Sequence, residues 1–104
     1  MKQLKIERDP GSLPTYALEM TDEGWTGRLA ADTDTSLVVP AGAKYALISS
    51  DDYYFVSASA ITLPSGAFTK TNAEHAKDVI TLNGETTLHF RSRNACDVSV
   101  SFFG

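Results

Sequence analysis

The residues best suited to metal binding or nucleophilic catalysis are few: His75, His89 and the single cysteine, Cys96. A metal site would need both histidines beside an acidic residue, but neither an HxH nor an HExxH spacing is present. His89 stands between Leu88 and Phe90, so a β-strand at this point would turn it away from the core. We therefore expect a surface histidine, no metal site and no cofactor.

Nucleophilic catalysis has no clear candidate. Cys96 alternates in phase with Val98 and Val100, which indicates a small buried hydrophobic residue. A catalytic thiolate would need a polarising neighbour, which the sequence does not specify. No serine lies in a Gly-x-Ser-x-Gly turn between a strand and a helix. We expect the protein not to be an enzyme.

Three acidic groups have the composition of a glycosidase carboxylate pair or of calcium ligands. Each group falls in a predicted turn, where aspartate is favoured because its side chain bonds the nearby backbone. None has the spacing of the EF-hand calcium loop. We therefore interpret them as turn residues: Asp22-Glu23, Asp32 with Asp34, and Asp51-Asp52.

Consecutive aromatic residues are the strongest candidates for a binding surface. Tyr53, Tyr54 and Phe55 would alternate between the faces of one strand, so at least one ring should face away from the core. Phe102 and Phe103 repeat this arrangement near the C-terminus. An outward ring can stack on a sugar or anchor a protein interface, with partial burial under a loop as the alternative.

β-strands must position these groups, because apolar residues recur with period two and turn residues interrupt them about every 8 to 12 positions. About eight or nine short strands in one domain must close as a sandwich or barrel to bury one face of each. The predicted fold is a single all-β, jelly-roll-like antiparallel β-sandwich over residues 1–104. Expected elements include strands at 35–39, 44–50, 53–59, 60–63 and 96–102, and one helical turn at 72–77.

Asn83-Gly84, between the apolar runs 78–82 and 86–91, is the strongest hairpin signal in the chain. A strict two-residue turn would place Ile80 and Phe90 on opposite faces. A three-residue turn with a bulge would bring them to one face. The sequence therefore predicts a bulged hairpin here.

Charge and hydropathy restrict the partners. Nine Lys and Arg against 13 Asp and Glu give a formal net charge of -4, which argues against binding through phosphate contacts. Charged residues interrupt the apolar stretch that a signal peptide needs, and no run approaches the roughly 18 apolar residues of a spanning helix. We expect no nucleic-acid partner, no membrane association and synthesis in a cytoplasm.

Several stretches resemble small virion proteins of tailed bacteriophages, and more narrowly the β-sandwich cement or decoration proteins on the outside of the head shell. They are LVVPAGAKYALIS at 37–49, Asp52-Tyr53-Tyr54, TTLHF at 86–90 and the strand 96–102. The resemblance covers roughly 33–103. It implies a structural protein that bridges subunits of the major capsid protein, self-associates as a dimer or trimer and lies on the virion exterior after synthesis in the host bacterial cytoplasm.

The interface of such a protein is expected at strand edges and outward rings, namely Tyr53, Tyr54 and Phe103. Leu4 and Ile6 are further candidates, because residues 1–8 lie outside the resemblance and form either an edge strand or an arm that reaches a neighbour. The alternative function is a carbohydrate- or receptor-binding module of a phage tail or secreted protein. It would use the same rings, with the turn aspartates holding hydroxyl groups or calcium.

Overall fold

The computed structural model describes residues 1–3, 20–63, 68 and 73–104. Within these ranges it contains eight strands and no helix. They are β1 (Gly24–Leu29), β2 (Thr35–Val38), β3 (Tyr45–Ser50), β4 (Phe55–Ser57), β5 (Glu74–His75), β6 (Val79–Thr81), β7 (Thr87–Arg91) and β8 (Cys96–Phe103). No described helix is therefore long and apolar enough to cross a membrane.

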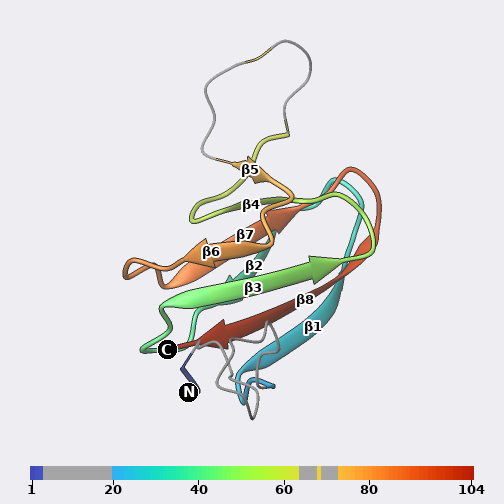
Figure 1. Ribbon diagram of the computed structural model, residues 1–104. Coiled ribbons are helices and arrows are strands. Elements are labelled where there is room, and N and C mark those ends of the chain that lie inside the picture. Colours follow the sequence, from blue (N-terminus) through green and yellow to red (C-terminus); the bar gives the residue numbers. More distant parts are fainter. Residues whose placement is uncertain (4–19, 64–67, 69–72) are drawn as a thin grey trace.

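The strands form two antiparallel sheets of four strands each (Figure 1). The first sheet has the order β1-β8-β3-β6, and the second has the order β2-β7-β4-β5. Neighbours in each sheet are therefore mostly far apart in sequence, and the chain passes repeatedly from one sheet to the other. The all-β prediction is confirmed.

Both sheets contribute to one hydrophobic core, which gives the molecule a sandwich-like architecture. From Cys96 to Phe102 the burial in β8 alternates, with Cys96, Val98, Val100 and Phe102 buried and Asp97 exposed, as predicted. Burying one face of each strand is the main stabilising contribution in such a fold, at about 25 cal/mol per Å² of apolar surface. The remaining buried members of the core are Leu29, Val39, Ala46, Ile48, Tyr54, Val56, Leu82, Leu88 and Phe90.

The predicted hairpin at Asn83-Gly84 is wrong, because β6 and β7 belong to different sheets. The backbone on each side of the turn bonds a distant segment instead: Leu82 N donates to Lys44 O at 2.7 Å, and Val39 N donates to Thr86 O at 2.9 Å. Gly84 has φ = 91°, a conformation that favours glycine, and it turns the chain from one sheet to the other. The apolar residues before and after the turn therefore enter the core from opposite sides.

Two further predicted elements are wrong. Residues 60–63 form no strand, because side chains bond the backbone of Ile61: its N–H donates to Asp34 Oδ1 and its carbonyl accepts from Arg91 Nη1. The expected helical turn at 72–77 is replaced by β5, which pairs with β4. A single turn is too short to be stable as a helix. As a two-residue strand, the same segment can instead form backbone hydrogen bonds with β4.

The two ends of the described chain meet beside the first sheet (Figure 1). Gly104 N donates to Lys2 O at 2.8 Å, and the N-terminal amine lies 3.7 Å from Asp22 Oδ2. Leu4, Ile6 and most of residues 1–8 lie outside the described residues, and so do the apolar positions from 16 to 19. The choice between an arm and an edge strand therefore stays a prediction.

Candidate functional site

Tyr53 is the predicted interface residue that the structure places at the surface, with 71% of its area exposed. Its ring stacks on His75 of β5, with centroids 5.2 Å apart and an interplanar angle of 29°. Phe55 lies on the same imidazole at 4.9 Å. Tyr53 N also donates to Asp52 Oδ1 at 2.7 Å, which fixes the start of the segment. The three rings form an exposed aromatic surface at the β5 edge of the second sheet.

Tyr54 does not belong to this surface, and the expectation that it is an exposed interface ring is wrong. Only 2% of its area is exposed, because the ring packs toward Phe90 with centroids 6.1 Å apart. Its hydroxyl donates to the carbonyl of Lys77. Burial, with a smaller contribution from Asp78, raises the pKa of Tyr54 to about 12. Tyr54 is therefore a core residue that ties β4 to the chain after β5.

Phe103 is likewise buried, with 3% exposure, so the expectation of an outward ring at this position is wrong. It is the last residue of β8 and pairs with Tyr45, and its carbonyl accepts from Lys44 N at 2.8 Å. The neighbouring Gly104 is bonded to the N-terminal segment. At the end of a strand, where the chain termini meet, alternation does not decide exposure. The other two predicted interface residues, Leu4 and Ile6, lie outside the described residues.

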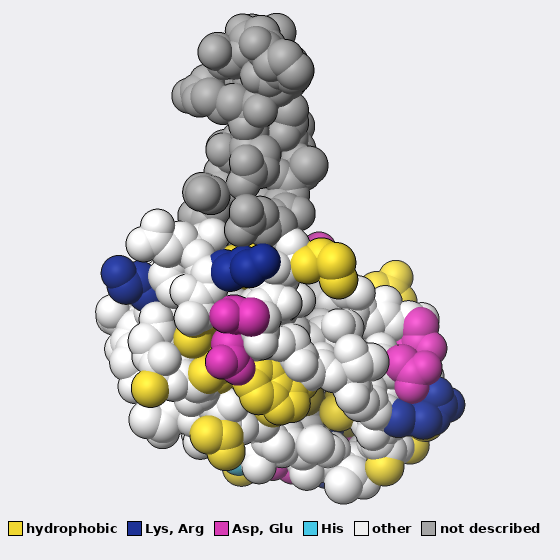
Figure 2. All heavy atoms as spheres, turned by 90° about the horizontal axis from the view of Figure 1, so that it is seen from below, with side chains coloured by type: hydrophobic (Ala, Val, Ile, Leu, Met, Phe, Trp, Pro, Cys, Tyr) yellow, Lys and Arg dark blue, Asp and Glu magenta, His cyan; other side chains and the backbone are white. Residues whose placement is uncertain are grey.

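Three exposed hydrophobic residues on outer strands escaped the sequence prediction. Trp25 on β1 is 40% exposed, Val38 on β2 is 74% exposed and Val79 on β6 is 57% exposed. These strands are outer strands of the two described sheets. Figure 2 shows hydrophobic side chains reaching the surface of one face among mainly uncharged atoms, with acidic and basic groups beside one another in two places. Strand order determines which strands are outer ones, so residue type alone did not indicate that these side chains would be exposed.

Asp22, Asp51 and Asp52 lie in bends, as predicted, but the side chains of Asp22 and Asp51 bond backbone that is distant in sequence. Asp51 Oδ1 accepts from Asp97 N at 2.8 Å, and Asp51 N donates to Asp97 O at 3.2 Å, which ties the loop after β3 to β8. Asp22 Oδ1 accepts from Lys2 N at 3.2 Å. Among the described residues, no group of three or more His, Cys, Asp or Glu is arranged to hold a metal ion.

A polar clamp, formed by Asp32, Asp34, His89, Arg91 and the backbone of Ile61, covers the outer face of β7. Arg91 donates to the Asp32 carboxylate at 3.0 and 3.1 Å and to Ile61 O at 2.6 Å. His89 Nδ1 lies 2.8 Å from Asp34 Oδ2. His89 therefore points away from the core, as predicted, and it acts as a bonding partner for a loop.

The clamp favours the ionised form of Asp34. Burial alone would raise its pKa, but the hydrogen bonds with His89 and Ile61 N outweigh that effect and hold the pKa below its ordinary value. The loop that carries Asp32 and Asp34 and the distant segment at Ile61 are thus joined to β7 by charged groups. The hydrogen bonds and ion pairs of the clamp thus give it a structural role in joining these segments to β7.

A hollow of about 610 Å³ lies between the end of β3 and the β5–β6 connection, and it borders the Tyr53 ring. Hydroxyl and carboxylate groups share its lining with that ring, among them Ser49, Asp52 and Asp78. The hollow is therefore lined by polar groups and apolar surface in similar measure, and the exposed Tyr53 ring borders it. Cys96, by contrast, is fully buried, as predicted.

Comparison of the chain with protein-family models, with curated proteins and with solved structures found no match.

Proposed function

We propose that the chain is a bacteriophage structural protein that binds between coat-protein subunits on the outer shell and stabilises it. One observation carries the proposal: an exposed large hydrophobic side chain lies on or against each of the four outer strands. Trp25, Val38 and Val79 lie on β1, β2 and β6, and Tyr53 stacks on His75 of β5. Outer strands with apolar side chains promote association with other chains.

The arrangement suits a protein that works in many copies. A domain of 104 residues gains little free energy from each contact, but copies at symmetric sites on a shell act collectively. Contacts at more than one edge allow one copy to bridge neighbouring coat subunits or to join a second copy as a dimer or trimer. The net charge of -4 favours a place on the virion exterior, away from packaged DNA.

We also propose that the sandwich is a jelly roll. The support is the pairing of the strands: β1 with β8, β2 with β7, β3 with β6 and β4 with β5. These pairs are nested along the chain, as they would be if one long hairpin were rolled up into two sheets. Eight strands in two sheets are the usual composition of a jelly roll.

Reconstitution with shells that lack the protein tests the docking surface. Val38→Thr keeps the shape of the side chain but buries an unpaired hydroxyl in a docked edge, which costs about 1 to 3 kcal/mol, or roughly fivefold or more in affinity. Tyr53→Ala removes the exposed ring and should also lower occupancy. Thr62→Ser, an exposed change outside the four outer strands, is the control. Unchanged occupancy for both Val38→Thr and Tyr53→Ala would refute this surface.

A second candidate is a carbohydrate-binding module of a phage tail or secreted protein, and the hollow beside Tyr53 favours it. An exposed ring stacks on the apolar face of a sugar, while nearby hydroxyl and carboxylate groups bond its hydroxyls. A glycan array, run with and without calcium, tests this candidate. Binding should survive Tyr53→Phe and be lost in Tyr53→Ala, and an array without hits removes the candidate.

A further inference from the structure

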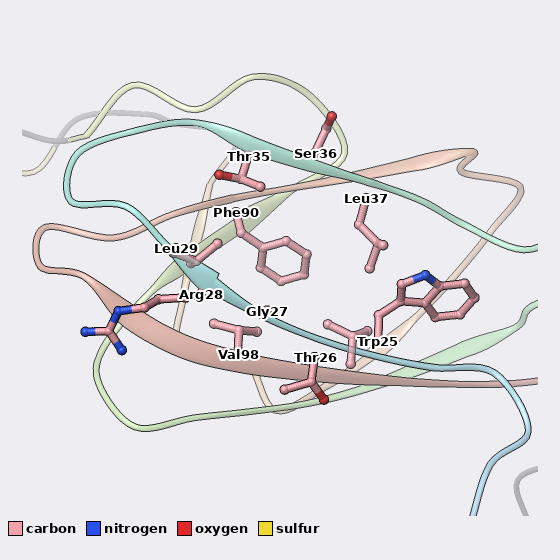
Figure 3. A pocket seen from close by; sticks show the side chains of 11 residues that line it. Trp25, Thr26, Gly27, Arg28, Leu29, Thr35, Ser36, Leu37, Phe90 and Val98 are labelled. Atoms are coloured by element: carbon pink, nitrogen blue, oxygen red, sulfur yellow. The ribbon is translucent and has the colours of Figure 1, made fainter.

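An apolar slot opens between the outer strands β1 and β2, where the two sheets face each other (Figure 3). Its volume is about 170 Å³. The floor is formed by Phe90 and Val98, and the walls are formed by Trp25, Leu29 and Leu37. In Figure 3 the charged and hydroxyl groups of Arg28, Thr26 and Ser36 point away from the opening. The slot thus leads from the surface to the core between almost entirely apolar walls.

Gly27 is the reason that the slot exists. In the β1–β8 register it lies opposite Val98, between the pairs Trp25–Val100 and Leu29–Cys96, so a side chain here would point inward. A Cβ atom added at Gly27 would meet no atom within 4 Å. Its φ lies outside the left-handed range, so neither strain nor crowding in the described chain requires glycine. Glycine within a strand often marks a bulge, a tight bend or a close approach by a ligand or another backbone, and the β1–β8 register runs through Gly27 without a bulge.

We infer that the slot binds one apolar aromatic side chain of a partner protein. An extended segment of that partner would present the ring and would lie along the side of the molecule where the outer strands β1 and β2 face each other. The volume matches the occupant, because an apolar protein cavity of about 150 Å³ binds benzene. A protein source fits the surroundings, because β1 and β2 are outer strands of the two described sheets and the partly exposed Trp25 lines the slot. Pockets for alternate side chains beside an outer strand are the usual means by which a sheet edge selects an extended segment.

The identity of the partner rests on the proposed function: the slot lies in the edge proposed to dock on the coat subunit. Its affinity for a ring does not depend on that proposal. Measurements on the purified chain therefore separate the two, because ring binding can be demonstrated even if the chain proves absent from virions.

Benzene titration followed by ¹H–¹⁵N NMR tests the slot directly. Trp25 is the single tryptophan, so its indole N–H is an unambiguous reporter in the slot wall. We expect a saturable shift of this signal and of the Gly27 amide. Gly27→Val fills the slot with the chain's own methyl groups and should weaken benzene binding at least about tenfold while raising the Tm by a few degrees.

Two variants keep this test decisive. Thr26→Val changes the adjacent, outward-facing residue of β1 and should leave benzene binding unchanged. Gly27→Ala fills the slot only in part and replaces Gly27→Val if that variant does not fold. Absence of a saturable shift in the wild-type chain, or an equal shift in a folded Gly27 variant, would overturn the inference.

A blocked peptide, Thr-Thr-Phe-Thr-Thr, identifies the source of the ring. We expect it to shift the same signals and to bind at least about tenfold more tightly than benzene, because its backbone can also pair with the strand edge. Its counterpart with Ala in place of Phe should not bind. If benzene binds but the Phe peptide does not, a protein source is refuted.

Discussion

Strand β7 separates two regions of opposite character. On its outer face, His89 and Arg91 enter the polar clamp, where charged groups of the chain bond one another and the backbone of Ile61. On its inner face, Phe90 forms the floor of the apolar slot, which no side chain of β1 fills because position 27 is glycine. The outer face of β7 therefore carries polar groups that are bonded within the chain, whereas its inner face borders an apolar slot that the described chain does not fill.

The difference shows how to distinguish structural from functional surfaces in this fold. In the clamp each charged group has a bonding partner within the chain, so the stability of the fold is sufficient to explain why these residues are present. On the outer strands β1 and β2, Val38 is mostly exposed and Gly27 leaves space unfilled, while Trp25 stays 40% exposed although its ring packs edge-on against Phe102. Substitutions in the first region should cost stability, and substitutions in the second should cost binding.

The largest expected contrast is between the adjacent tyrosines. Tyr54→Ala removes a buried ring and its hydrogen bond to Lys77, so it should lower the free energy of unfolding by about 3 to 5 kcal/mol. Tyr53→Ala removes an exposed ring and should change that free energy by no more than about 0.5 kcal/mol. Urea unfolding of both variants measures the contrast. Equal losses of stability in the two variants would contradict the assignment of Tyr54 to the core and of Tyr53 to a binding surface.

Two arginines provide the next test. Arg91→Ala removes the cation that joins β7 to Asp32 and Ile61, and the loss should be about 3 kcal/mol. Arg28→Ala also removes an ion pair, with Asp97 at 3.1 Å, but both of its side chains are mostly exposed, so the loss should stay below about 1 kcal/mol. Thermal unfolding of both variants gives the ranking. A larger effect at Arg28 would contradict the role assigned to the clamp.

Alkaline unfolding should report on Tyr54. The pKa of the hydroxyl is raised from about 10 in the unfolded chain to about 12 in the folded chain, so the folded state favours the neutral form. This contribution is complete below about pH 10 and is lost as the pH rises through 12, by about 3 kcal/mol. Tyr54→Phe should unfold with a weaker pH dependence across this range, as followed by circular dichroism. An identical pH dependence would show that Tyr54 ionises freely.

The smallest expected effect concerns Asp34. Because its pKa in the folded state is lowered, its contribution to stability is present above the unfolded value, about 4, and is lost as the pH falls through the folded value. Asp34→Asn keeps an acceptor for Ile61 N but removes the charge beside His89, so we expect a loss of about 1 kcal/mol at neutral pH. The variant should also lose less stability on acidification. An unchanged acid profile would contradict the role given to the carboxylate.

Period-two patterning predicted the fold class and the inner face of β8, because Cys96, Val98 and Phe102 lie in the interior of a long strand. It failed where the backbone found distant partners. At Asn83-Gly84 local turn chemistry suggested a hairpin, but the flanking segments pair with β2 and β3 in separate sheets. The strand expected at 60–63 was lost to side-chain bonds from the clamp.

The candidate surface was predictable only in part. Consecutive rings required at least one outward aromatic residue, and Tyr53 is such a residue, but period two could not tell that Tyr54 lies inside. Phe103 failed because the chain ends meet there. The candidate role of three further residues depends on their position in the outer strands: Trp25, Gly27 and Val38. Strand order decides which strands are outer ones, and the local sequence pattern does not predict that order.

The proposed role is that many copies of this chain coat a shell, which they contact through the outer strands. Quantitative mass spectrometry of purified particles, giving copies of the chain for each copy of the major coat protein, tests that claim most directly. The account predicts a ratio within a few-fold of one. A few tens of copies or fewer would place the chain at the tail or a vertex and favour receptor binding, and absence from particles would contradict the virion role.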